Sequence, residues 1–457
     1  MTYAQEVKIG NITIGGSNRI AIQSMTNVPL ADISGSVLQC KQLFDAGADI
    51  VRLSTPRKPD IDCLREVKKI LVRDGYNNPL VADVHFDAQI AEECAKIVEK
   101  VRINPGNYID KRANFKELKL TDYEYNLELE KIHDRLLPLI KICRENGTAI
   151  RIGSNHGSLS DRILSRYGNT AKGMVEAAME FIGIFVAENF QNLVISMKAS
   201  NVKVMTESCE LLNQRMIETG HVFPQHLGVT EAGAGNDARI KSVLGISYLL
   251  NKGIGDTIRV SLTENPTNEI VFADKFVKML GEKRQYSENK VAEPTPSTCE
   301  FTLHHSEKDE AIIETCSTLS NDLIDKKISQ LHIKGTIDGI DNDDLASDIL
   351  QASGICISKA EFISCPGCGR TNYDLERISE EVKREFSHLK GLKIATMGCV
   401  VNGPGEMSDA DYGCVGSTKD HVIIYKKQTP IIRDVPQDDA VKMLKKVIVE
   451  NGDWKEK

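Results

Sequence analysis

The stretch Ala149-Ile150-Arg151-Ile152-Gly153-Ser154-Asn155 is one of eight short β-rich runs that determine the fold. A longer segment with helical periodicity follows each run. The runs lie at 20–25, 49–54, 80–86, 100–105, 149–155, 193–199, 226–232 and 257–263. Eight such pairs in roughly 280 residues match the count and size of a (β/α)8 barrel of the TIM type. A doubly wound open sheet, the alternative α/β fold, would not need eight evenly spaced strands.

The chain of 457 residues is longer than one hydrophobic core usually supports. We expect a barrel at 1–281, a linker and small insert at 282–345, and an α+β domain at 346–457. The first boundary is marked by a segment rich in charged residues and proline, at 282–298.

Composition narrows the classes of partner. The chain is 41% hydrophobic and 27% charged, with a formal net charge of −8, so bulk attraction to nucleic acid or to an acidic membrane is not favoured. We find neither the pattern of a signal peptide nor an apolar run of the ~18–20 residues that span a membrane. The twelve cysteines are mostly scattered singly, unlike a disulfide framework. We therefore expect a cytoplasmic protein with no nucleic-acid or membrane partner.

Polar side chains gather at the C-terminal ends of the predicted strands, where barrel enzymes have their active sites. Five of them are cations within apolar runs: Arg52, Arg102, Arg151, Lys198 and Arg259. A planar guanidinium can donate two hydrogen bonds to phosphate oxygens, so this set predicts a multiply charged anionic ligand. The alternative is that each arginine forms a structural salt bridge with a carboxylate.

Other residues at these strand ends allow more than one interpretation. Glu231 is either a charge balancer or a general acid. Lys198, on the sixth predicted strand, is a candidate phosphate contact and also a candidate Schiff-base nucleophile. The remaining polar residues at this end include Gln23, Asp83, His85, Asn104, Asn155 and Ser261.

A cysteine pattern near the C-terminus predicts a metal site. Cys365-Pro366-Gly367-Cys368 forms one tight turn, and Cys399 opens a glycine–proline loop that ends at Glu406. The Cys-x-x-Cys pair alone is shared by redox dithiols and zinc knuckles, and Cys414 would complete a four-thiolate zinc ribbon. A [4Fe-4S] cluster with three cysteines and a weaker carboxylate ligand fits the spacing better.

Two segments around these cysteines resemble the cluster motifs of the 4-hydroxy-3-methylbut-2-enyl diphosphate synthase family. They are Ser364-Cys365-Pro366-Gly367-Cys368-Gly369-Arg370-Thr371 and Met397-Gly398-Cys399-Val400-Val401-Asn402-Gly403-Pro404-Gly405-Glu406. Barrel segments at 22–27, 82–86, 101–107, 151–158, 196–200 and 228–233 are also similar to that family.

The resemblance implies a reaction and its cofactor. The family opens and dehydrates 2-C-methyl-D-erythritol 2,4-cyclodiphosphate, giving 4-hydroxy-3-methylbut-2-enyl diphosphate. Two electrons come from ferredoxin or flavodoxin through a [4Fe-4S] cluster. The likeness also implies a head-to-tail homodimer in which the cluster domain of one chain caps the barrel of the other.

Residue roles follow from the same resemblance. Cys365, Cys368, Cys399 and Glu406 would hold the cluster, and Glu231 would protonate or steady the reacting substrate. The residues that would bind substrate are Arg52, Asp83, Arg102, Asn104, Arg151, Asn155, Lys198, Ser261 and Asn402.

The insert departs from the family pattern. Compact members have almost nothing between barrel and cysteine pair, and longer members have a whole extra domain there, whereas this chain has a short segment at 282–345. This departure leaves open whether the cluster domain caps the barrel of the partner or that of its own chain. The alternative function is a Schiff-base barrel lyase that uses Lys198 and a structural zinc ribbon.

Overall fold

The computed structural model describes residues 4–110, 117–283, 297–400 and 403–456. Its N-terminal part is the predicted (β/α)8 barrel, with eight parallel strands in the order β8-β7-β6-β5-β4-β3-β10-β9. A bridge between Ile195 and Gln225 brings β8 against β9 and closes the ring. The strands are β3 (Ala21–Met25), β4 (Ile50–Ser54), β5 (Leu80–Asp83), β6 (Lys100–Ile103), β7 (Ala149–Asn155), β8 (Leu193–Lys198), β9 (His226–Leu227) and β10 (Thr257–Ile258).

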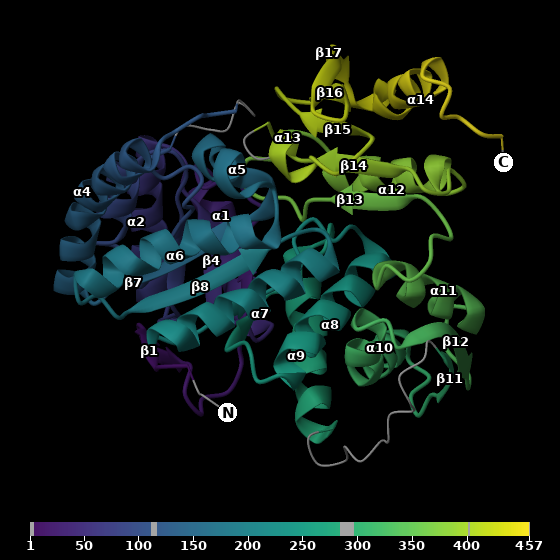
Figure 1. Ribbon diagram of the computed structural model, residues 1–457, viewed down its shortest axis with the longest axis horizontal. Coiled ribbons are helices and arrows are strands. Elements are labelled where there is room, and N and C mark those ends of the chain that lie inside the picture. Colours follow the sequence, from purple (N-terminus) through teal and green to yellow (C-terminus); the bar gives the residue numbers. More distant parts are fainter. Residues whose placement is uncertain (1–3, 111–116, 284–296, 401–402, 457) are drawn as a thin grey trace.

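Helices follow these strands and form the outer layer (Figure 1). They are α1 (Ile33–Asp45), α2 (Lys58–Arg73), α3 (Ala88–Cys94), α4 (Asp122–Asn146), α5 (Asp161–Tyr167), α6 (Ala171–Ala187), α7 (Val202–Thr219), α8 (Gly235–Asn251) and α9 (Pro266–Lys283), with the short 3-10 helix η1 (His156–Ser158) after β7. A hairpin of β1 (Val7–Ile9) and β2 (Ile12–Ile14) packs against apolar residues near the N-terminal ends of the strands, such as Ile50 and Val81. The hairpin therefore covers the end of the barrel opposite the strand C-termini.

Two predicted strands, 226–232 and 257–263, are much shorter in the structure. β9 ends at Leu227, and a Cβ on Gly228 would lie 2.5 Å from the Arg259 carbonyl oxygen, closer than side chains allow. Beyond it Glu231 has a left-handed backbone (φ 49°), which a strand cannot adopt. The residues after β9 and β10 are thus loops over the barrel mouth.

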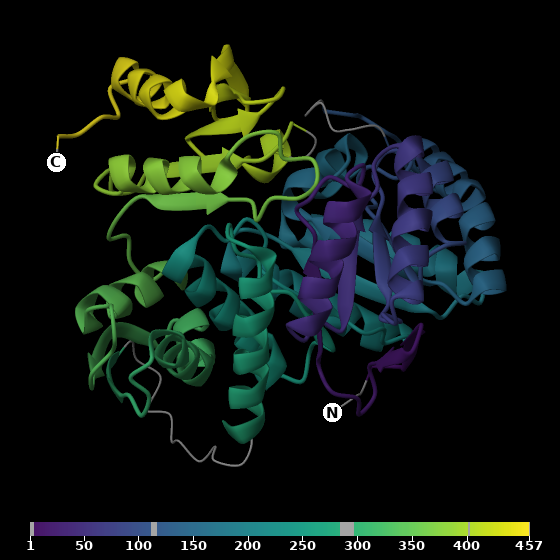
Figure 2. The same ribbon diagram turned by 180° about the vertical axis from the view of Figure 1, so that it is seen from behind.

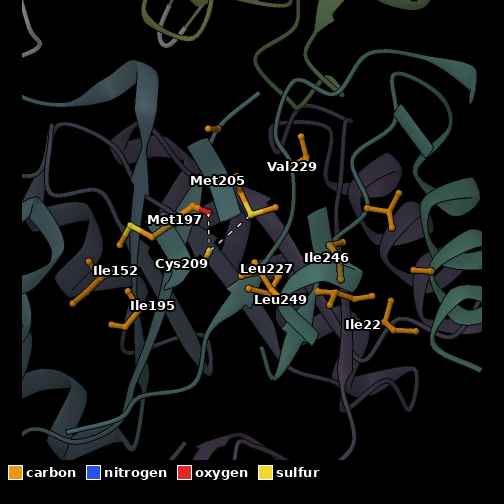
Figure 3. Close-up of a cluster of buried hydrophobic side chains, with 14 of the residues drawn as sticks. Ile22, Ile152, Ile195, Met197, Met205, Cys209, Leu227, Val229, Ile246 and Leu249 are labelled. Atoms are coloured by element: carbon orange, nitrogen blue, oxygen red, sulfur yellow. Dashed lines mark hydrogen bonds between the residues drawn. The ribbon is translucent and has the colours of Figure 1, made fainter. Parts of the chain in front are cut away.

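Packing between the helices and the barrel strands explains one of the isolated cysteines. Cys209 of α7 is fully buried, and its thiol contacts the Met197 carbonyl oxygen and the Met205 sulfur, each at 3.9 Å (Figure 3). Burial raises the pKa of this thiol to about 12, so it stays protonated and packs as a small apolar group.

The insert is a compact βαβα unit on the side of the barrel. It comprises β11 (Ser297–Thr302), α10 (Lys308–Ile324), β12 (Ile328–Lys334) and α11 (Asn342–Ala352), with the two strands parallel. Residues of α10 such as Ile313 belong to the same hydrophobic core as the barrel helices. In chain order the unit stands between α9 and β13, and Figure 2 shows it in green beside the barrel and below the C-terminal sheet.

The C-terminal part is a mixed five-stranded sheet in the order β13-β14-β15-β16-β17. Its strands are β13 (Glu361–Ser364), β14 (Lys393–Met397), β15 (Tyr412–Gly416), β16 (His421–Lys426) and β17 (Thr429–Pro436), and its helices are α12 (Leu375–Phe386), α13 (Gly403–Glu406) and α14 (Ala440–Glu450), the last preceded by the 3-10 helix η2 (Gln437–Asp439). β13 ends at the loop that carries Cys365 and Cys368, and β14 ends at the loop that carries Cys399. Because the two strands are parallel neighbours, both loops lie at the same end of the sheet.

Candidate active site

The C-terminal sheet covers the barrel mouth of its own chain (Figure 1). The Thr263 hydroxyl, on the loop after β10, lies 2.9 Å from the Ser364 hydroxyl and donates to the Cys365 carbonyl oxygen at 3.0 Å. On the other side of the mouth, the Asn155 amide donates to Glu406 Oε1 at 3.3 Å. The family resemblance implies a cap on the partner's barrel, and the short insert leaves capping within one chain open as the alternative. In this structure the cap and the barrel belong to one chain.

A glycine pair allows the two parts to approach closely. A Cβ on Gly157 would lie 2.3 Å from the Gly405 carbonyl oxygen, and a Cβ on Gly405 would lie 1.9 Å from the Gly157 carbonyl oxygen. No other residue fits at either position without separating the loops. The contact holds the loop that carries Glu406 against the end of β7.

Ion pairs connect the barrel, the insert and the cap at their junction. Asp237 of α8 pairs with Lys359 at 3.0 Å and with Lys383 of α12 at 2.6 Å. Lys359 also pairs with Asp348 of α11 at 2.6 Å. Because Asp237 and Asp348 have little solvent exposure, these bridges are screened less than surface pairs and help to fix the cap in place.

The cap and the mouth enclose a pocket of about 720 Å³, which includes space open to solvent. The barrel side chains in its wall are Met25, Arg52, Asp83, His85, Arg102, Arg151, Asn155, Lys198, Thr230, Glu231, Arg259 and Ser261. The cap contributes Cys365, Pro366, Gly367, Cys368, Arg370, Thr371, Met397, Gly398, Cys399, Gly403 and Glu406. Residues far apart in the chain therefore face one space: Lys198 and Cys365 are 167 positions apart, and Asn155 and Glu406 are 251 positions apart.

One predicted site residue of the described chain is not in that wall. Asn104 is buried beside the pocket, where its amide donates to the Ser158 hydroxyl at 2.8 Å and its carbonyl oxygen accepts from the Gly106 N–H at 3.0 Å. These bonds shape the loop after β6. Asn402 lies outside the described residues.

The five predicted cations differ in how they are neutralised. Arg259 donates to both carboxylate oxygens of Glu269, at 3.1 and 3.0 Å, so the salt-bridge alternative is correct for this residue. Arg102 lies 3.0 Å from Asp83 and also donates to the Gly153 carbonyl oxygen at 3.0 Å. Arg52 lies farther from Asp83, at 3.9 Å.

Asp83 carries the negative charge on this side of the mouth. Burial acts to raise the pKa of its carboxyl, but the guanidinium groups of Arg52 and Arg102 outweigh burial and hold the pKa well below its usual range. Asp83 is therefore ionised, and its single negative charge is shared by Arg52 and Arg102.

Among the described residues, no carboxylate forms a salt bridge with Arg151 or Lys198. Arg151 is 1% exposed and donates only to the Ser196 hydroxyl, at 2.6 Å, while its Nε and Nη2 have no partner among the described residues. Burial and the neighbouring charge of Arg151 lower the pKa of the Lys198 amine well below its usual range. Because unpaired buried cations are costly, the geometry fits an anion that completes this part of the site.

Glu231 faces the cap. The Thr230 hydroxyl donates to its Oε1 at 2.6 Å, and its backbone is held in the left-handed region. Burial, followed by the charge of Glu406, raises the pKa of Glu231 well above its usual value. A protonated carboxyl in this position is suited to act as a general acid.

The two cysteine loops pack closely against each other. The Gly398 N–H donates to Cys365 Sγ at 3.1 Å, and a Cβ on Gly398 would lie 2.5 Å from the Thr371 hydroxyl. In the described part of the chain, no three Cys, His, Asp or Glu side chains converge on a single ion. Thiolates are ligands of both zinc and iron–sulfur clusters.

Cys414, the fourth ligand of the zinc alternative, is fully buried in the hydrophobic core of the C-terminal sheet. Burial raises the pKa of its thiol to about 12. The pocket wall contains Cys365, Cys368, Cys399 and Glu406 but not Cys414.

Two domain families match the chain. The GcpE TIM-barrel domain matches residues 4–274, and the GcpE protein C-terminal domain matches residues 361–450. The chain belongs to the GcpE family. Both matches leave out the insert, which lies between them.

Curated relatives cover nearly the whole chain. It is 39% identical to 4-hydroxy-3-methylbut-2-en-1-yl diphosphate synthase (flavodoxin) of Phocaeicola vulgatus over 604 residues, covering 99% of this chain and 98% of that protein. It is 40% identical to the corresponding ferredoxin enzyme of Trichormus variabilis over 449 residues, covering 98% and 92%. The first alignment is much longer than the 457 residues of this GcpE chain, so the Phocaeicola protein has long segments without a counterpart here.

Other comparisons add less. Dihydropteroate synthase of Yersinia pestis aligns with a TM-score of 0.41 and 11% identity, covering 61% of this chain and 99% of that one, a likeness too distant to inform the chemistry. None of the helices in the described residues is both long and apolar enough to span a membrane. Family membership and the buried Cys414 do not favour the Schiff-base lyase with a zinc ribbon.

Sequence reasoning gave no role to one pocket residue, Arg370. It lies two residues after Cys368, within the first cysteine motif. A cation next to a cluster motif could have been recognised in the sequence as a candidate site residue. The direction in which its side chain points depends on how the loop packs against the barrel.

Proposed function

We propose that this chain converts 2-C-methyl-D-erythritol 2,4-cyclodiphosphate into 4-hydroxy-3-methylbut-2-enyl diphosphate. The reaction takes up two electrons and two protons. The ring opens where a carbon–oxygen bond to phosphate breaks, and one hydroxyl group leaves as water. The diphosphate remains on the product.

One observation carries this proposal: buried cations without counter-charges and a set of three thiols and a carboxylate face each other across one pocket. An anionic substrate bound by the cations would lie next to the group that the three thiols and the carboxylate hold. The names of the relatives, which give this product with flavodoxin or ferredoxin, support the same reaction.

The barrel would bind the diphosphate. Arg151 and Lys198 would contact phosphate oxygens directly, and Arg102 and Arg52, held by Asp83, would complete the cationic surface. An anion there would reverse the effect of burial on Lys198 and keep its amine charged. The remaining groups would orient the substrate: Asn155 and Ser261 in the wall, Asn104 through the loop after β6, and Asn402 near a substrate oxygen.

Glu231 would supply the proton for the departing hydroxyl. Its raised pKa keeps it protonated, and the Thr230 hydroxyl fixes its orientation at 2.6 Å. Closure of the cap excludes water, which strengthens each charge interaction in the pocket.

Cys365, Cys368, Cys399 and Glu406 would hold a [4Fe-4S] cluster. When bound, such a cluster supplies single electrons and a Lewis-acidic iron next to the substrate. A carboxylate is a weaker and more exchangeable ligand for it than a thiolate, so Glu406 would release its position most readily. The Asn155 amide, 3.3 Å from Glu406 Oε1, could receive that carboxylate as it moves.

Flavodoxin or ferredoxin would deliver the electrons in the cytoplasm. A homodimer remains a prediction from the family resemblance. Because the pocket is built from one chain, we propose that each chain of such a dimer carries a complete site. The insert would act as the spacer between barrel and cap, with domain limits at 281 and 346.

Metal analysis of anaerobically purified protein tests the proposal. We expect about four irons and matching sulfide per chain, an electron paramagnetic resonance signal after reduction, and turnover with reduced flavodoxin or ferredoxin. Stoichiometric zinc without iron would contradict the proposal. Borohydride trapping of a carbonyl substrate on Lys198 would instead support the lyase alternative.

A further inference from the structure

Arg370 lies in the loop that connects β13 to α12, two residues after Cys368, and it lines the pocket. The loop is pressed onto the barrel, because a Cβ on Gly369 would lie 2.8 Å from the Val28 carbonyl oxygen. Its turn is closed by the Thr371 N–H, which donates to the Cys368 carbonyl oxygen at 2.9 Å. Packing of the loop therefore holds the Arg370 side chain in the pocket.

The guanidinium of Arg370 is short of partners. Its Nε and Nη1 are buried, and neither has a hydrogen-bond acceptor among the described residues. No carboxylate of the described part of the chain forms a salt bridge with it within 4.0 Å, although Asp83 and Glu406 are near enough for their charges to act on it. Buried donors of a charged group are rarely left unsatisfied, so the arrangement indicates a missing anionic partner.

The surroundings of Arg370 show where that partner would be. The Cys368 and Cys399 thiols lie on its cap side, and its charge reaches Arg52 and His85 on the barrel side. Of the described residues that the cap contributes to the pocket wall, Arg370 is the one cation. It thus stands at the boundary between the proposed cluster site and the proposed substrate site.

We propose that Arg370 is a positioning residue that places a positive charge between the iron–sulfur cluster and the cyclic diphosphate substrate. This inference rests on the proposed function. Thiolates and a carboxylate give the cluster site negative charge, and the substrate is an anion, so bringing the two together is opposed by repulsion. The Arg370 guanidinium attracts both, and it makes addition of an electron and binding of substrate easier.

Two substitutions and a control test this role. R370Q removes the charge but keeps hydrogen-bonding atoms, R370K keeps the charge without the planar fork, and R384Q changes an exposed arginine on α12 that does not line the pocket. For each anaerobically loaded protein we would measure iron content, the midpoint potential of the cluster with and without substrate, KM and kcat.

We expect R370Q to bind a full complement of iron, to have a more negative midpoint potential than the wild type, and to show a KM raised about tenfold. The shift in potential caused by substrate should be larger in R370Q, because the cation between the substrate and the cluster is then missing. R370K should recover part of each change, and R384Q should match the wild type.

Unchanged potential and KM in R370Q, with full iron, would overturn the inference. Loss of iron from both R370Q and R370K would also overturn it, because Arg370 would then be needed only to fold the loop. Both results differ from failure of the proposed function, in which the wild-type chain itself would hold no cluster.

Discussion

Arginines on the two sides of the barrel mouth differ in whether the protein gives them a carboxylate partner. On one side Arg259 is matched by Glu269, whose two carboxylate oxygens lie 3.1 and 3.0 Å from its nitrogens, and Glu269 also accepts from the Ser24 hydroxyl at 2.7 Å. On the other side Arg151 donates to one hydroxyl group, and two of its nitrogens have no partner in the part of the chain that the structure describes. Both arginines are buried.

The difference separates arginines that stabilise the barrel from those that await a ligand. A buried cation with its own carboxylate needs no further anion, and removing it leaves the carboxylate unpaired. A buried cation without a carboxylate lowers the stability of the ligand-free protein, and this cost is offset only when an anion binds. Substitutions should therefore affect stability on one side of the mouth and substrate affinity on the other.

The largest effect is expected on the paired side. R259M should lower the free energy of unfolding by about 3–5 kcal/mol, because Glu269 would remain buried without its partner. Chemical denaturation of the wild type and the variant would measure this. The double variant R259M/E269Q should recover much of the loss, and a double variant as unstable as R259M would contradict the pairing argument.

The unpaired side should show the opposite pattern. R151M should lower kcat/KM on the order of a hundredfold, because hydrogen bonds to a charged phosphate are lost, while the free energy of unfolding stays the same or rises. Steady-state kinetics and denaturation of the same preparations would measure both quantities. A loss of stability as large as that of R259M would remove the distinction between the two sides.

At the junction between barrel and cap, as on the paired side of the mouth, charged groups have partners of opposite charge. This pairing predicts that stability depends on pH. Burial acts to raise the pKa of Asp237, but Lys383 and Lys359 outweigh it and lower the pKa to about 2. Since this value is below the usual one of about 4, the ion pairs contribute stability above pH 4, and this contribution is lost as the pH falls towards 2.

The contribution amounts to about 2 kcal/mol. D237N should lower stability by about this much at pH 7 and should flatten the dependence of stability on pH between 4 and 2. A variant with the same pH dependence as the wild type would show that other carboxyl groups cause the acid sensitivity.

Much of this could be predicted from the sequence, because the signals were local. β7, with an arginine in an apolar run, was predicted with its exact bounds, 149–155. The Cys-x-x-Cys turn and the Gly-Pro loop were predicted to form one site, and the structure places Cys365, Cys368, Cys399 and Glu406 in the wall of one pocket. β9 was predicted too long because the left-handed backbone of Glu231 has no pattern in the sequence.

What escaped prediction depends on distant contacts. Glu269 lies on α9, and nothing in its sequence neighbourhood shows that its carboxylate turns inward to Arg259. Arg370 needed the packing of Gly369 against Val28 to be seen as a pocket residue. β15, with Gly413 and Gly416, was not predicted because glycine weakens the strand signal.

The central claim is that the unpaired cations and the cluster ligands of one chain form one site. Mixing two inactive variants tests it most directly: K198A lacks a barrel cation, and C365A lacks a cluster ligand. After joint unfolding, refolding and anaerobic cluster loading, the mixture should remain as inactive as either variant alone, because neither chain has a complete pocket. Recovery towards about a quarter of wild-type activity, expected if half the dimers are mixed and each has one intact site, would show that the cap of one chain serves the barrel of another.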